Sequence, residues 1–63
     1  MAVLACWKTT DGRYVVYLHE GQRAELCEVV GVSRLTVLGP VPLYRVTDRL
    51  AELGYGVEDL APE

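Results

Sequence analysis

The sequence is poor in the residues that usually build metal sites, disulfide frameworks and catalytic centres. Its 63 residues include two cysteines, one histidine and no phenylalanine. Small secreted scaffolds normally carry four or more cysteines, and zinc sites need paired ligands at short spacing, which Cys6, His19 and Cys27 do not have. We therefore expect both cysteines to be reduced core residues, and we expect no metal ion or other cofactor.

The chain also lacks the features of membrane and nucleic-acid-binding proteins. No apolar run approaches the roughly 18 residues of a membrane span, and the N-terminus lacks the basic-then-apolar pattern of a signal peptide. Six Lys and Arg against nine Asp and Glu give a net charge of -3, and the basic residues are scattered singly. The sequence thus predicts a cytoplasmic protein without membrane contact and disfavours nucleic acid as a partner.

The shortness of the chain limits its hydrophobic core. Residues 1–63 provide for a single small domain, and a chain of this length buries only about 60% of its unfolded surface. The composition, 51% hydrophobic and 24% charged, is nevertheless that of a folded protein. Because metals and disulfides are not indicated, we expect association into a homo-oligomer, a dimer or higher, to complete the core.

The clearest pattern in the sequence is an amphipathic helix over Pro42–Gly54. Apolar residues recur there at steps of three and four, which places them on one stripe, and proline is accepted in a first helical turn. The stripe consists of Leu43, Val46, Leu50 and Leu53, and the opposite face carries Arg45, Asp48, Arg49 and Glu52.

A β-hairpin is predicted at the N-terminus, with strands over Ala2–Lys8 and Arg13–Leu18. The second strand is rich in β-branched and aromatic residues, and Asp11-Gly12 suits a two-residue type I′ turn, in which both residues have positive φ. With that turn, Trp7 lies opposite Val16 and Cys6 lies opposite Tyr17.

Both faces of this hairpin carry apolar side chains. One face holds Val3, Ala5, Trp7, Tyr14, Val16 and Leu18, and the other holds Leu4, Cys6, Val15 and Tyr17. One amphipathic helix can cover a single face, so the second face must meet another helix, another subunit or a ligand. His19, at the end of the second strand, is expected to be an exposed turn residue.

The middle of the chain leaves two folds open. In the favoured one, Gln22–Val30 is a helix ended by Gly31 and Val32–Leu38 is a third strand, which gives an α+β fold of order ββαβα with an antiparallel sheet packed on the C-terminal helix. In the alternative, residues 22–30 form a strand and the chain is a four-stranded meander plus the C-terminal helix. The uneven spacing of Glu25 and Glu28 argues against that strand.

A third interpretation comes from a resemblance. The stretch Leu26-Cys27-Glu28-Val29-Val30-Gly31-Val32-Ser33-Arg34-Leu35-Thr36-Val37 resembles the core of bacterial helix-turn-helix regulators, with a small residue, a glycine four positions later and Val-Ser opening the second helix. The resemblance implies that Gly31 is the turn, Ser33 the cap of the recognition helix and Arg34 a DNA contact. Gly39-Pro40 departs from the pattern, since it would end that helix after about one and a half turns.

The C-terminal residues are acidic. Glu58, Asp59 and Glu63 follow the predicted helix, and we expect a mobile tail from about residue 58.

These observations favour a binding protein over an enzyme. The chain has one histidine, no carboxylate pair of evident geometry and little length with which to enclose a pocket. We expect a small non-enzymatic binding or regulatory module that self-associates through the second apolar face or the edge of its sheet, with a further protein partner possible. The expected interface or ligand residues are the aromatic ones, Trp7, Tyr14, Tyr17 and Tyr44. The alternative function, a helix-turn-helix-like DNA-binding regulator, would use Arg23, Arg34 and Arg45.

Overall fold

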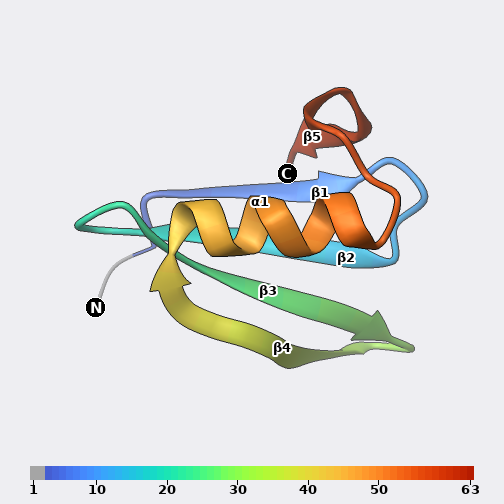
Figure 1. Cartoon of the computed structure of the whole chain (residues 1–63). Coiled ribbons are helices and arrows are strands. Elements are labelled where there is room, and N and C mark those ends of the chain that lie inside the picture. The colour runs from blue at the N-terminus through green and yellow to red at the C-terminus, as the bar shows by residue number, and fades with distance from the viewer. Residues whose placement is uncertain (1–2) are drawn as a thin grey trace.

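In the described part of the chain, an antiparallel sheet of five strands carries a single α-helix across one of its faces (Figure 1). The computed structural model describes residues 3–63, so the predicted start of the first strand at Ala2 lies outside the described residues. Within the described part, the spatial order of the strands is β4-β3-β2-β1-β5. The elements are β1 (Ala5–Thr9), β2 (Tyr14–His19), β3 (Arg23–Val30), β4 (Ser33–Pro42), α1 (Leu43–Glu52), the short 3-10 helix η1 (Val57–Asp59) and β5 (Leu60–Pro62).

The N-terminal hairpin has the predicted register but not the predicted turn. Trp7 pairs with Val16 and Cys6 with Tyr17, which confirms the prediction. Gly12 has a positive φ, whereas Asp11 does not, so the turn is not type I′. Residues 10–13 connect the strands instead, and the Asp11 carboxylate accepts hydrogen bonds from the Thr9 hydroxyl and the Arg13 N–H.

The predicted helix over Gln22–Val30 is wrong, and with it the order ββαβα. Residues 23–30 form β3, which pairs along its length with β2 and β4. Its two glutamates fall on opposite faces, because Glu25 lies opposite Tyr17 and Glu28 opposite Tyr14. Two ladders of backbone hydrogen bonds and the burial of Ala24 and Leu26 outweigh the modest helix propensity of this segment.

The first four strands follow the alternative meander. Gly31, which was expected to end a helix, has φ of +60° in the tight turn between β3 and β4. Because residues 26–37 are two strands and a turn, the helix-turn-helix implied by the resemblance is not formed. A hairpin and a helix C-terminus both require a residue with positive φ, and glycine supplies it in either case.

The helix α1 matches its prediction in position and in most of its buried stripe. Val46 and Leu50 are buried against Val16, Ala24 and Leu26 of the sheet. Leu43 is half-buried on this core, whereas Leu53, predicted to be in the stripe, lies in the exposed turn that follows the helix. No side chain caps the helix start; the N–H of Leu43 donates to the Gln22 carbonyl at 2.8 Å instead, which ties α1 to the β2–β3 loop.

The helix is not the last element, contrary to the prediction, and residues 58–62 are not a free tail. After Gly54 the chain forms η1 and then β5, which pairs with β1 through Trp7–Pro62, Lys8–Ala61 and Thr9–Leu60. Leu60 packs against the core, and the N–H of Glu63 donates to the Cys6 carbonyl at 3.0 Å. The acidic end of the chain therefore closes the edge beside β1.

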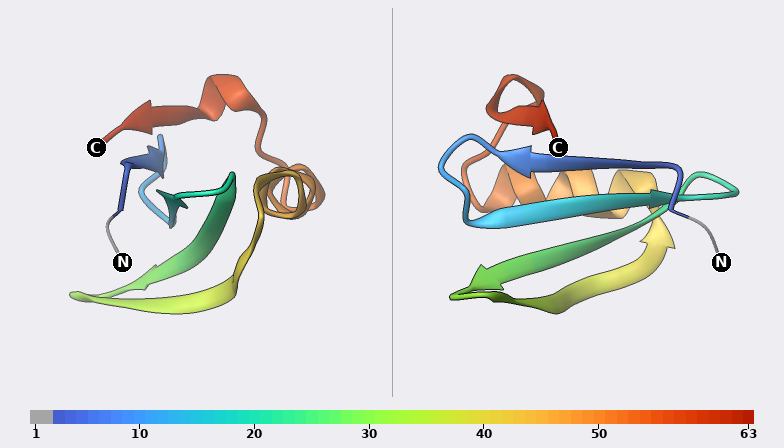
Figure 2. Two further views of the ribbon diagram at one scale, coloured as in Figure 1. Left: turned by 90° about the vertical axis from the view of Figure 1, so that its left-hand side faces the viewer. Right: turned by 180° about the vertical axis from the view of Figure 1, so that it is seen from behind.

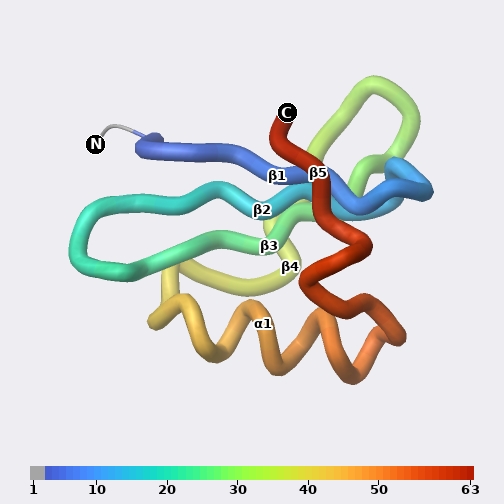
Figure 3. The backbone as a smooth tube through the Cα atoms, turned by 90° about the horizontal axis from the view of Figure 1, so that it is seen from above, coloured from blue at the N-terminus to red at the C-terminus, as the bar shows by residue number. Residues whose placement is uncertain are grey.

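The sheet curves strongly, and this curvature covers much of its second face. The end-on view in Figure 2 and the view from above in Figure 3 show the tip of the β3–β4 hairpin on the side of the sheet away from α1. Val15 and Cys27 are buried on that side although no helix covers them. The sequence predicted that another helix, another subunit or a ligand would cover this face. In the structure the curved sheet itself covers part of it, while Leu4, at its border, remains 58% exposed.

Among residues 3–63, no helix combines the length and the apolar character that a membrane crossing requires.

Candidate interaction surface

The outer edge of β4 presents unpaired backbone groups. β4 is the edge strand of the sheet, with β3 on one side and no strand on the other in the described chain. The N–H of Val29 donates to Arg13 on the β2 side, so Val29 and its partner on β4, Arg34, form a pair without hydrogen bonds between them. Arg34 and, two residues on, Thr36 therefore direct their N–H and C=O groups away from the sheet.

Apolar side chains accompany these free backbone groups. Leu35 is 55% exposed and Val37 42% exposed, and Val32 at the hairpin tip is fully exposed. Leu35 lies on the same face as α1, since it pairs with Glu28, which pairs with Tyr14. Residues 33–37, which we call the β4 edge, thus offer a short, apolar and unpaired strand.

The second half of β4 does not share this character. The register between β3 and β4 shifts on both sides of Leu38: Cys27 pairs with Thr36 and Leu26 with Leu38, so Val37 between them has no partner on β3. Pro40 and Pro42 lack the N–H that a further strand would need. Gly39 lies so close to β3 that a Cβ there would be 2.5 Å from the Ala24 carbonyl oxygen. Bulges and prolines are the usual means by which proteins block sheet edges, so the block applies to residues 37–42 and leaves residues 33–36 of the β4 edge regular.

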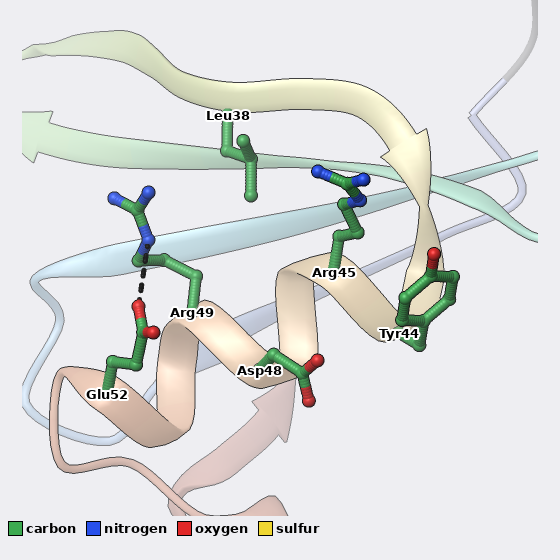
Figure 4. A pocket seen from close by; sticks show the side chains of 6 residues that line it. All are labelled: Leu38, Tyr44, Arg45, Asp48, Arg49 and Glu52. Carbon is green, nitrogen blue, oxygen red and sulfur yellow. Dashed lines mark ion pairs between the residues drawn. The ribbon is translucent and has the colours of Figure 1, made fainter.

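A shallow groove of about 340 Å³ runs between this second half of β4 and α1 (Figure 4). Leu38 points into it from β4, and Arg45 and Arg49 point towards the strand from the helix. Arg49 also contacts Glu52, with 3.3 Å between Nε and Oε1, while Asp48 points away from β4. The groove is open and mixed in charge, which suits contact with a protein surface more than enclosure of a small molecule.

The charge at the β4 edge is neutralised across the second face of the sheet. The Arg34 guanidinium donates to both carboxylate oxygens of Glu63 at 3.0 Å and to the Tyr17 hydroxyl at 2.6 Å. The hydrogen bonds from Arg34 hold the pKa of the Glu63 carboxyl below its usual value, and those to Tyr17 and Glu63 raise the pKa of Arg34. Lys8 lies 3.8 Å from the same carboxylate. Arg34 of β4 and Glu63 after β5 thereby join the two opposite edges of the sheet.

The thiol of Cys6 belongs to the same cluster and is not activated. Burial, followed by its hydrogen bond to Glu63 at 3.2 Å, raises the pKa of Cys6 to about 11. A thiol with so high a pKa is almost wholly protonated at neutral pH and is a poor nucleophile. Cys27 is buried on β3.

His19 is buried rather than exposed, which corrects the sequence-based expectation. Its Nε2 lies 2.8 Å from the Glu25 carboxylate, in a direction that does not align a hydrogen bond, and Nδ1 has no partner among residues 3–63. In that same part of the chain, no three His, Cys, Asp or Glu side chains are grouped so that they could hold a metal ion.

The four aromatic residues predicted at an interface are dispersed. Trp7 and Tyr14 are half-buried against the core under α1, and the Tyr14 ring meets Tyr55 edge-on at 5.7 Å between centroids. Tyr17 lies on the opposite face under Arg34, with 6.0 Å between the guanidinium carbon and the ring centre. Tyr44, 61% exposed, borders the groove beside β4. Of the four, Tyr17 contacts the β4 edge through Arg34, and Tyr44 lies beside Leu38 in the second half of β4.

The three arginines predicted to contact DNA are likewise on different elements. Arg23 donates to the Pro40 carbonyl at 2.8 Å, Arg34 is bound to Glu63, and Arg45 lines the groove on α1. They do not form one basic patch.

The residues of the β4 edge were missed as an interaction site, although the sequence holds a signal for them. Residues 33–38 combine β-branched and aliphatic residues with a single charge. Residues 32–38 were predicted as a third strand, but the sequence did not show that this strand lies at an edge because the strand order was unknown.

Comparisons of the chain with models of known protein families, with curated proteins and with solved structures find no match.

Proposed function

We propose that the protein is a small non-enzymatic binding or regulatory module that self-associates through the β4 edge, residues 33–37. The observation that carries this proposal is the coincidence of free backbone groups at Arg34 and Thr36 with exposed apolar side chains at Leu35 and Val37. A strand of this kind is a ready template for pairing with another strand. Of the two contacts predicted from the sequence, the second apolar face and the edge of the sheet, this proposal takes the edge.

The absence of repulsion at this edge supports the proposal. Soluble proteins usually protect edge strands with lysine, proline or inward-pointing charges. Here the prolines and the register shifts lie in residues 37–42, which leaves residues 33–36 regular, and the single charge of the β4 edge, Arg34, is paired with Glu63 on the far face. Two copies can therefore approach without placing uncompensated like charges against each other.

The remaining surface supports a binding role more than catalysis. The groove between β4 and α1 is shallow, and the Cys6 thiol is held in its protonated form. The cytoplasm is its expected location, on the basis of the sequence; the free thiols of Cys6 and Cys27 are compatible with a reducing compartment.

Sedimentation of matched leucine variants tests the proposal. Wild-type protein should gain mass between about 10 and 500 µM, the range expected for an interface smaller than the standard size. Leu35→Lys, at the β4 edge, should remain a monomer throughout. Leu53→Lys, which places the same charge at a leucine 41% exposed beyond the helix, should associate like the wild type. A wild-type protein that stays monomeric, or a loss of association in both variants, would contradict the proposal.

A further inference from the structure

Within the β4 edge, only two residues direct both backbone groups outward. They are Arg34 and Thr36, because Ser33 and Leu35 face β3 in hydrogen-bonded pairs with Val30 and Glu28. An added antiparallel strand must align its own outward-facing residues with these two.

The edge is complementary to itself in one register above all others. When two copies run antiparallel, Arg34 of each copy can lie opposite Thr36 of the other, which gives two hydrogen-bonded pairs and about four interchain N–H···O bonds. A register centred on Arg34 or on Thr36 aligns only one such pair, with about two bonds. The favoured register has Leu35 at its centre.

We infer that the partner at the β4 edge is a second copy of this chain, paired antiparallel with Leu35 on the two-fold axis; this inference rests on the proposed function. The two Leu35 residues then form a non-hydrogen-bonded pair with Cα atoms about 4.5 Å apart, on the face that carries α1. Such an interface is isologous, as most dimer interfaces are.

Charge and hydrophobicity identify the second copy as the occupant. The apolar side chains that need cover, Leu35 and Val37, are matched in this register by Leu35 and Ser33 of the other copy. The Arg34 side chain points to the opposite face, where Glu63 binds it with two hydrogen bonds, so the two-fold axis does not bring free positive charges together. The pairing therefore requires no third component.

Disulfide trapping tests the register. The Cα atoms of two cysteines on the axis would be about 4.5 Å apart. This distance suits a disulfide, whose Cα atoms are usually about 4.4–6.8 Å apart. The Cys27 thiol lies 3.9 Å from the Thr36 hydroxyl and would trap a thiol at position 36 within one chain, so these variants also carry Cys27→Ala. In that background Leu35→Cys, oxidised with diamide, should form a covalent dimer at least about ten times faster than Thr36→Cys, since Thr36 lies two residues from its counterpart, roughly 8 Å away. Leu53→Cys is the matched control, which measures how fast covalent dimers form by random collision. Oxidised wild-type protein shows how fast they form through Cys6 and Cys27.

A mixture of two variants provides a second measurement that does not alter Leu35. Ser33→Cys mixed with Val37→Cys should yield the mixed disulfide, because these positions face each other across the axis, and neither variant alone should cross-link at a comparable rate.

The outcomes separate this inference from the proposed function. Faster trapping of Thr36→Cys than of Leu35→Cys, or no mixed disulfide while wild-type protein dimerises in sedimentation, overturns the register and leaves edge association intact. Wild-type protein that remains monomeric overturns both. Circular dichroism of each reduced variant establishes that it is folded before it is oxidised.

Discussion

Proline at position 36 should separate assembly from folding. The Thr36 N–H points away from β3, so Thr36→Pro removes no backbone hydrogen bond of the monomer; it removes only the weak 3.9 Å contact between the Thr36 hydroxyl and the Cys27 thiol. We therefore expect it to lower the free energy of unfolding by no more than about 1 kcal/mol. In the proposed dimer each Thr36 N–H donates across the interface. Two bonds of about 1 kcal/mol each are lost, which weakens the dimer by about 2 kcal/mol, or about 30-fold in Kd.

Leu35→Pro is the matched control, because the Leu35 N–H faces β3. It removes a bond of the sheet itself and should lower the free energy of unfolding by about 1–3 kcal/mol, measured by urea denaturation with circular dichroism as the signal. The Kd of Thr36→Pro is measured by sedimentation equilibrium. The reasoning is refuted if Thr36→Pro unfolds as readily as Leu35→Pro, or if it associates as tightly as the wild type.

Three further predictions concern the remainder of the fold. A pKa of about 11 in place of 9.0 lowers the thiolate fraction of Cys6 about 100-fold, so iodoacetamide should label it about that much more slowly than an ordinary thiol at neutral pH. Because the folded-state pKa of Glu63 is depressed, its contribution to stability is present above about pH 4.5 and is lost as the pH falls through the lowered value. In that acidic range, the urea concentration at the unfolding midpoint should depend less on pH for Glu63→Gln than for the wild type. An unchanged pH dependence would contradict the pairing with Arg34. Gly39→Ala should lower the free energy of unfolding by more than about 2 kcal/mol, since φ is +112° and the new Cβ would meet the Ala24 carbonyl oxygen; a loss below about 0.5 kcal/mol would contradict this close approach.

The sequence by itself determined the elements whose signals are local. The helix α1 was predictable because its apolar residues repeat at helical spacing over three turns, and the register of β1 and β2 because the connection between them is short and rich in turn residues. The sequence also indicated the second apolar face of the hairpin. It did not indicate that Arg34 and Glu63, 29 residues apart, would meet across that face.

Tertiary structure decided everything that depends on pairing between distant segments. Residues 22–30 have no decisive periodicity, and Gly31 suits a helix end and a hairpin turn equally well, so only the ladders with β2 and β4 select the strand. The sequence could not predict the strand order either, because β5 pairs with β1 only after the chain has crossed the sheet as α1. An edge exists only once the neighbours of every strand are known, which is why residues 33–37 became a candidate interaction surface in the folded chain and not before.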